Sequence, residues 1–136
     1  MKSSALLFFL LSFWGTFAQQ SVLDTQSEVQ NVSATKFNQL LNETSNPQLL
    51  DIRTPIEYQA GHIKDAILVN YYDRNFVNNI LKLNLDKNQP VFIYCRSGHR
   101  SGNSVNIFKK LGFKKIINLA HGINDWYRQG LTVEKK

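Results

Sequence analysis

Short apolar segments alternate with segments of helical periodicity along most of the chain. Consecutive apolar residues bounded by turn residues predict strands at 49–52, 66–69, 91–94 and 116–119. Because these segments contain few alternating polar residues, we expect strands that are buried on both faces, as in a parallel sheet covered by helices. The pattern therefore predicts an α/β fold.

Helix signals separate the predicted strands. Ser33 is a good N-cap for a first helix, and Val32 and Phe37 have the spacing of a hydrophobic staple. Thr54 and Glu57 have the spacing of a capping box, which predicts a short second helix. Apolar faces predict three further helices, formed by Phe76, Val77, Ile80 and Leu81, by Val105, Ile107, Phe108 and Leu111, and by Ile123, Trp126 and Tyr127.

The N-terminus has the pattern of a secretory signal at residues 1–18. Lys2 supplies a positive charge, an apolar run follows, and Ala18 ends a small-x-small cleavage site. The run is shorter than the roughly 20 apolar residues that a membrane span requires. We expect a protein that is exported, periplasmic or secreted, and that keeps no membrane anchor after processing.

The rest of the chain predicts a single domain. Residues 19–31 are mostly polar and aperiodic, which predicts a flexible leader, and residues 32–136 carry the alternating elements of the domain. A hydrophobic fraction of 43% and a charged fraction of 19% are typical of a globular protein. The net charge is +6, but the lysines are dispersed and no aromatic residues are interleaved with them, so we expect no nucleic-acid partner.

The chain contains one cysteine, Cys95, directly after the predicted strand at 91–94. It is followed by a glycine-containing loop and a predicted helix. The carboxyl end of a strand is where parallel α/β folds gather their ligands. A single cysteine cannot form an intramolecular disulfide, so Cys95 is a buried structural residue, a site of intermolecular pairing or a reactive thiol.

The residues around Cys95 favour the reactive thiol. Free amides of residues 97–101 and the start of a helix stabilise a thiolate and create an anion site. Gly98 permits a tight turn close to a ligand. The planar guanidinium groups of Arg96 and Arg100 suit an oxyanion. We expect Arg100 to lie near the sulfur and Arg96 to project toward the mouth of the loop.

The segment around Cys95 and three other segments resemble motifs of the rhodanese family. C-R-S-G-H-R at 95–100 is similar to the family's C-R-x-G-x-R loop, and residues 50–58 are similar to its D-V-R-x-x-x-E-[FY] segment. Residues 61–67 resemble its G-H-I-x-x-A segment, and 122–126 resemble its G-[IVW]-x-x-W segment. The sequence departs from the family at Asp65 and His121, where glycine is usual.

The resemblance implies a five-stranded parallel sheet flanked by helices on both faces and a sulfurtransferase without a metal or organic cofactor. Cys95 would be the catalytic residue and would carry sulfur as a persulfide. The donor would be a small anion such as thiosulfate, and the acceptor would be cyanide, a thiol or a protein. The substrate-binding residues would be Arg96, Ser97, Gly98, His99, Arg100 and Ser101.

Other polar residues of these motifs are interpreted as structural. Glu57 caps a helix, Arg53 is placed to pair with a carboxylate such as that of Asp51, and His62 satisfies backbone groups. Trp126 and Tyr127 are expected to be core anchors, and Tyr94 is expected to point to the opposite side of its strand from Cys95.

Two alternatives remain open. A thiolate-based phosphatase or arsenate reductase uses a C-x5-R loop, which would require arginine at position 101, where this chain has Ser101. A persulfide carrier or a rhodanese-like binding module would retain Cys95 and both loop arginines. A steady-state assay with thiosulfate, cyanide and a panel of thiols distinguishes an enzyme that turns over from a protein that only carries the sulfur.

The signal sequence predicts that the exported protein starts at or near Gln19, because Ala18 ends the small-x-small site. N-terminal sequencing of the exported protein checks this. A membrane-bound product that retains Met1 would contradict the expected processing.

Overall fold

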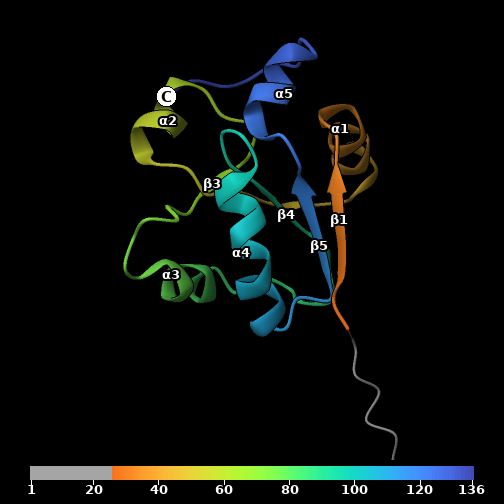
Figure 1. Ribbon diagram of the computed structural model, residues 1–136, viewed down its shortest axis with the longest axis vertical. Helices are drawn as coiled ribbons and strands as arrows, with labels where there is room; N and C mark the ends of the chain where they lie inside the picture. The colour runs from red at the N-terminus through yellow and green to blue at the C-terminus, as the bar shows by residue number, and fades with distance from the viewer. Residues whose placement is uncertain (1–25) are drawn as a thin grey trace, which may run out of the picture.

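The computed structural model describes residues 26–136 (Figure 1). The predicted signal at 1–18 and the first part of the predicted leader lie outside the described residues. Strands and helices alternate in the order β1 (Glu28–Val32), α1 (Ala34–Glu43), β2 (Gln48–Asp51), α2 (Pro55–Ala60), β3 (Ile67–Leu68), α3 (Phe76–Lys82), β4 (Val91–Tyr94), α4 (His99–Lys110), β5 (Lys115–Leu119) and α5 (Gly122–Arg128).

The strands form one five-stranded sheet in the order β1-β5-β4-β2-β3, and every pairing is parallel. The expected fold class is therefore confirmed. Strand β4 is the central strand, with β5 and β2 as its neighbours. The segments that follow β2, β4 and β5 consequently meet at one edge of the sheet, because carboxyl ends of parallel strands lie together.

The sheet separates two apolar cores. Phe92 and Tyr94 of β4 face the core that also contains Phe37 and Trp126. Val91, Ile93 and Cys95 face the other core, which includes residues of α3 and α4. Figure 1 shows α4 crossing in front of the central strands. Tyr94 and Cys95 therefore point to opposite sides of the sheet, as the alternation of a strand requires.

Strand β1 differs from the expectation of a leader that extends to residue 31. Residues 28–32 pair with β5 in parallel register, from Glu28 with Lys115 to Val32 with Leu119. β1 is an edge strand and is only partly buried, so it tolerates polar residues such as Gln30. Its stabilisation comes from backbone pairing, which leaves little signal in the apolar pattern.

Two predicted apolar faces are narrower than expected. In α3, Phe76 and Ile80 are buried, but Val77 is 39% exposed and Leu81 is 45% exposed. Each exposed residue directly follows a buried one in this seven-residue helix. Only the stripe formed by Phe76 and Ile80, four positions apart, reaches the core. In α5, Tyr127 is also exposed, so the expectation that it anchors the core was wrong.

A buried polar network lies on the Tyr94 side of the sheet. The Arg53 guanidinium donates to both carboxylate oxygens of Asp51, with the shortest contact at 2.6 Å, and to the carbonyl of Gly61 at 2.7 Å. The Tyr94 hydroxyl donates to Asp51 at 2.6 Å and accepts from the Ile63 amide at 3.1 Å. Burial and the neighbouring Asp51 carboxylate raise the pKa of Tyr94, so its hydroxyl remains a donor. The network joins the ends of β2 and β4.

His62 and Trp126 contact backbone groups. His62 Nδ1 lies 3.0 Å from the Tyr58 carbonyl oxygen, and its ring stacks on that of Tyr58 with centroids 3.8 Å apart. The backbone of His62 also pairs with Glu134 near the C-terminus. Trp126 Nε1 donates to the Thr132 carbonyl at 2.9 Å. These contacts hold the C-terminal segment against α2 and α5.

The structure accommodates both departures from the family glycines. Asp65 has φ = 62°, in the left-handed region that aspartate tolerates better than most residues. His121 has φ = −112° and needs no glycine. The two turns are therefore compatible with the residues present.

Candidate active site

Cys95 lies between the carboxyl end of β4 and the start of α4, and is 1% exposed. Its Sγ atom accepts hydrogen bonds from the Gly98 amide at 3.2 Å and the Ser101 amide at 3.4 Å. The Ser101 hydroxyl oxygen lies 3.5 Å from the same sulfur. The loop therefore forms a cradle of neutral donors around one sulfur atom.

These donors act against the effect of burial on the thiol. Burial raises the pKa of Cys95, whereas hydrogen bonds from the Ser101 hydroxyl and from the Ser101, Gly98 and Ser97 amides lower it. The net result is a pKa below the ordinary value of a cysteine thiol. The site consequently stabilises the thiolate, the nucleophilic form of cysteine, relative to the thiolate of a free cysteine.

Two glycines allow the loop to contact the turn between β5 and α5. Gly98 has φ = +96°, and a Cβ atom there would lie 1.9 Å from the Ala120 carbonyl oxygen. Gly122 has φ = +63°, and a Cβ atom there would lie 2.3 Å from the Arg96 carbonyl oxygen. Both positions combine left-handed backbone with a close approach, so both require glycine.

Amides at the start of α5 also hold the loop. The Ile123 amide donates to the Cys95 carbonyl at 2.9 Å, and the Asn124 amide donates to the Arg96 carbonyl at 3.1 Å. The backbone of Cys95 and of the next residue is thereby attached to a helix that packs against α1. Asp125 makes that attachment firmer because its carboxylate accepts from the Ala34 amide at 2.7 Å.

Arg100 has a different partner from the one expected. Its two terminal nitrogens donate to the two carboxylate oxygens of Glu57 at 2.8 and 2.7 Å. Its guanidinium carbon lies 5.4 Å from the centroid of the Tyr72 ring. The planar fork of Arg100 is thus bound to a carboxylate, a partner that the sequence did not predict, and the expectation that Arg100 binds substrate stays a prediction.

Glu57 performs its predicted capping and also binds Arg100. Its carboxylate accepts from the Thr54 amide at 3.0 Å and from the Thr54 hydroxyl at 2.9 Å. The hydrogen bond with Arg100 is the largest of the causes that lower the pKa of Glu57 to about 2. Glu57 is thus ionised throughout the neutral and mildly acidic range.

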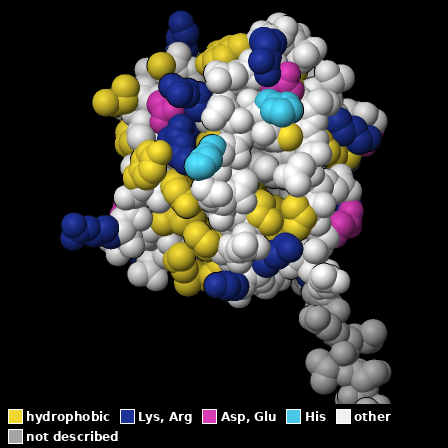
Figure 2. Space-filling view, viewed as in Figure 1, with side chains coloured by type: hydrophobic (Ala, Val, Ile, Leu, Met, Phe, Trp, Pro, Cys, Tyr) yellow, Lys and Arg dark blue, Asp and Glu magenta, His cyan; other side chains and the backbone are white. Residues whose placement is uncertain are grey.

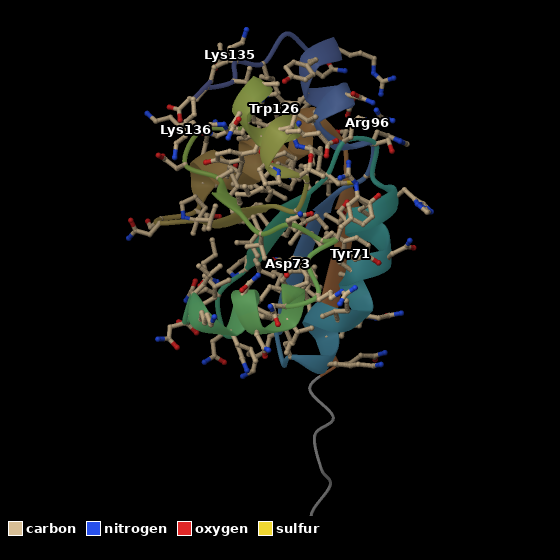
Figure 3. All side chains as sticks on the ribbon, turned by 90° about the vertical axis from the view of Figure 1, so that its left-hand side faces the viewer. Tyr71, Asp73, Arg96, Trp126, Lys135 and Lys136 are labelled. Atoms are coloured by element: carbon tan, nitrogen blue, oxygen red, sulfur yellow. The ribbon has the colours of Figure 1, made fainter. Side chains whose placement is uncertain are left out.

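The other loop side chains lie at the surface. Arg96, Ser97 and His99 are exposed, and none of the ion pairs among residues 26–136 involves Arg96. Figure 3 shows Arg96 at the edge of the molecule. The guanidinium of Arg96 is therefore available to an anion that approaches from solvent.

Sequence reasoning missed the Glu57–Arg100 pair and the contact between the loop and α5. The two charged residues are 43 positions apart, so no local spacing joins them. The strand order would have indicated the pair. Because β2 pairs with β4, α2, which follows β2, lies beside the loop that follows β4. In the same way, the pairing of β4 with β5 brings the start of α5 to the loop.

Other features of residues 26–136 lie apart from this loop. Surface hollows of about 530 and 610 Å³ are lined by other parts of the chain, including Tyr58 in the smaller and Trp126 in the larger. Within the described part of the chain, no three or more His, Cys, Asp or Glu side chains are grouped to hold a metal ion. No helix there is long and apolar enough to cross a bilayer.

Comparison with known proteins identifies relatives with the same fold. A sulfurtransferase of Allochromatium vinosum is 33% identical over 105 residues, covering 77% of this chain and 94% of its own length. The Bacillus subtilis putative sulfur carrier protein YrkF is 30% identical, covering 76% of this chain but 54% of its own length. The crystal structure of a rhodanese-like domain protein from Staphylococcus aureus superposes with a TM-score of 0.65 at 25% identity, covering 80% of this chain and 98% of its own.

The family model for the rhodanese-like domain matches residues 33–129, which include the cradle around Cys95 and strands β2 to β5 of the parallel sheet. The match covers most of the chain and agrees with the relatives and with the structure. The chain therefore belongs to the rhodanese-like domain family.

Proposed function

We propose that this protein transfers a sulfane sulfur from thiosulfate or a similar anionic donor to a thiophilic acceptor through a persulfide on Cys95. The observation that carries the proposal is the cradle of amide and hydroxyl donors around the Cys95 sulfur. The family and the relatives support sulfur transfer in general, since one relative is a sulfurtransferase and another a putative sulfur carrier protein.

The proposed reaction has two displacements. In the first, the Cys95 thiolate attacks the outer sulfur of thiosulfate; a new S–S bond forms, the S–S bond of thiosulfate breaks, and sulfite leaves with the electron pair. In the second, cyanide or a thiolate attacks the terminal sulfur of the persulfide, and the Cys95 thiolate leaves. Each step starts or ends with negative charge on the Cys95 sulfur, which the cradle stabilises. Neither step needs an external oxidant or a general base.

Arg96 is the residue best placed to meet the donor. It is exposed, follows the nucleophile directly and takes part in none of the ion pairs of residues 26–136. A guanidinium can bind the oxygens of a sulfonate-like group through parallel hydrogen bonds. The donor would therefore approach with its oxygens toward Arg96 and its outer sulfur toward Cys95.

A persulfide carrier is the second candidate function. It is favoured by the similarity to YrkF and by the burial of Cys95, which is 1% exposed. In that case the first displacement is unchanged, but the sulfur stays on Cys95 until a partner protein removes it. Rapid steady-state turnover with cyanide or small thiols supports the enzyme, whereas a stable persulfide with negligible turnover supports the carrier.

The central residue of the proposal is tested by Cys95→Ser. The wild-type protein should gain the mass of one sulfur atom on incubation with thiosulfate, and the variant should gain none and form no thiocyanate from cyanide. The reason is that this chain contains no other thiol. Mass spectrometry and a thiocyanate assay measure the two results. Turnover that survives in the serine variant would overturn the persulfide mechanism.

The cradle is tested by Ser101→Ala, which removes the hydroxyl that lies 3.5 Å from the sulfur. Because this hydrogen bond favours the thiolate, its loss should raise the pKa of Cys95. A hydrogen bond to a charged group contributes about 1.5 kcal/mol or more, so alkylation by iodoacetamide below the inflection pH should slow about tenfold.

Ser104→Ala is the matched control for that experiment. Ser104 is a buried serine on the same helix, and its hydroxyl donates to the Ser101 carbonyl instead of to the sulfur. Its pH profile of alkylation should stay close to that of the wild type. An equal displacement of the profile in both variants would mean that general loosening of α4, and not the Ser101 hydroxyl, affects the thiol.

A further inference from the structure

The pair between Glu57 and Arg100 is held from both sides. The side chains are 26% and 14% exposed, so the pair is largely shielded from water. Both terminal nitrogens of Arg100 are bound to the carboxylate, and Thr54 donates two further hydrogen bonds to it. The Tyr72 ring lies against the guanidinium. The hydrogen bonds with the carboxylate and the contact with the Tyr72 ring fix the direction in which Arg100 points.

Arg100 is close enough to Cys95 for their charges to interact. Arg100 lies in the first turn of α4, immediately before Ser101, whose amide and hydroxyl contact the sulfur. Attraction by the Cys95 thiolate contributes to the raised pKa of Arg100, after the larger effect of its hydrogen bond with Glu57. Without the Glu57 carboxylate, the Cys95 sulfur or an anion bound beside it would be the alternative acceptor for this guanidinium.

We propose that Glu57 is a positioning residue that withholds Arg100 from the sulfur and leaves donor recognition to Arg96. This inference rests on the proposed function, since it concerns the same thiolate. In the resulting site, neutral donors contact the sulfur, the charge of Arg100 is balanced by a carboxylate, and one open guanidinium meets the incoming anion.

Withholding Arg100 has a chemical consequence. A thiolate bound tightly by a guanidinium is more stable but less nucleophilic, because nucleophilicity falls as the thiol pKa falls. A second cation at the sulfur would also retain sulfite after the first displacement. Glu57 would thus favour reactivity and product release over the strongest possible binding of anions.

The charged and titratable groups around the sulfur come from every neighbouring element. They are Arg96 of the loop, His99 and Arg100 of α4, Glu57 of α2, Tyr72 after β3, His121 in the turn before α5, and Asp125 and Arg128 of α5. Asp125 and Arg128 lie 3.7 Å apart as a pair, and Asp125 also accepts from the Ala34 amide. Glu57 is therefore the carboxylate whose removal leaves a partly buried guanidinium beside the sulfur without its partner.

The test is Glu57→Gln, which keeps the shape and an acceptor oxygen but removes the charge. Arg100 should then turn toward the sulfur, so the inflection of iodoacetamide alkylation should move to lower pH. The thiosulfate KM should fall about tenfold, the equivalent of one added charge-assisted hydrogen bond, and kcat should fall as sulfite release slows. If the substitution instead loosened the hydrogen bonds to the sulfur, the inflection of alkylation would move to higher pH, because those bonds lower the pKa of Cys95.

Two further variants distinguish a changed position of Arg100 from a general loss of local structure. In Glu57→Gln combined with Arg100→Met, the freed cation is absent, so the inflection should no longer lie below that of the wild type. Thr54→Val removes a cap hydroxyl but leaves the ion pair, and should keep the wild-type inflection. An inflection in Glu57→Gln that is unchanged or raised would overturn the proposal, as would a lowered inflection that persists in the double variant.

Failure of this proposal is distinguishable from failure of the proposed function. Alkylation reports the thiolate whether or not sulfur is transferred, and persulfide formation in the wild type is measured by mass. A wild-type protein that forms no persulfide would contradict the proposed function, while the displacement of the alkylation profile in Glu57→Gln would still decide the role of Glu57.

Discussion

Close backbone contact between the cysteine loop and the start of α5 determines how the site is built. Gly98 lies against the Ala120 carbonyl, and Gly122 lies against the backbone of Arg96, at distances that exclude a Cβ atom at either glycine. Amides of α5 bind the carbonyls of Cys95 and Arg96. With its carbonyls bound behind it, the loop turns its free amides toward the sulfur. The orientation of the donors therefore depends on this contact.

The groups around the Cys95 sulfur separate neutral hydrogen-bond donors from charged side chains. Neutral donors from Gly98 and Ser101 contact the sulfur itself. The charge of Arg100 is balanced by Glu57. Figure 2 shows positively charged and histidine side chains together with hydrophobic ones on the face that α4 crosses. In the proposed reaction, such a site would stabilise the leaving Cys95 thiolate without binding it so tightly that the second displacement stops.

Sequence reasoning predicted what is encoded locally. The apolar runs gave four of the five strands, and Thr54 with Glu57 gave the capping box that the structure contains. It missed β1, whose half-polar residues are stabilised by pairing with β5. It also missed the ion pair of Arg100, because the partner Glu57 comes from a distant segment that only the strand order brings near. Contacts between segments that are distant in the chain leave no periodic pattern in the sequence.

The groups that contact the Cys95 sulfur are neutral amides and a hydroxyl, so we expect these donors, and not exposed arginine side chains, to stabilise the thiolate. A pH titration of the thiolate ultraviolet absorbance at low and at high salt tests it most directly. Salt screens exposed charges strongly but affects buried hydrogen bonds little. The expected inflection lies below the value of about 8.5 for free cysteine and at the same pH in both salts. An inflection that rises toward the free-cysteine value at high salt would contradict it.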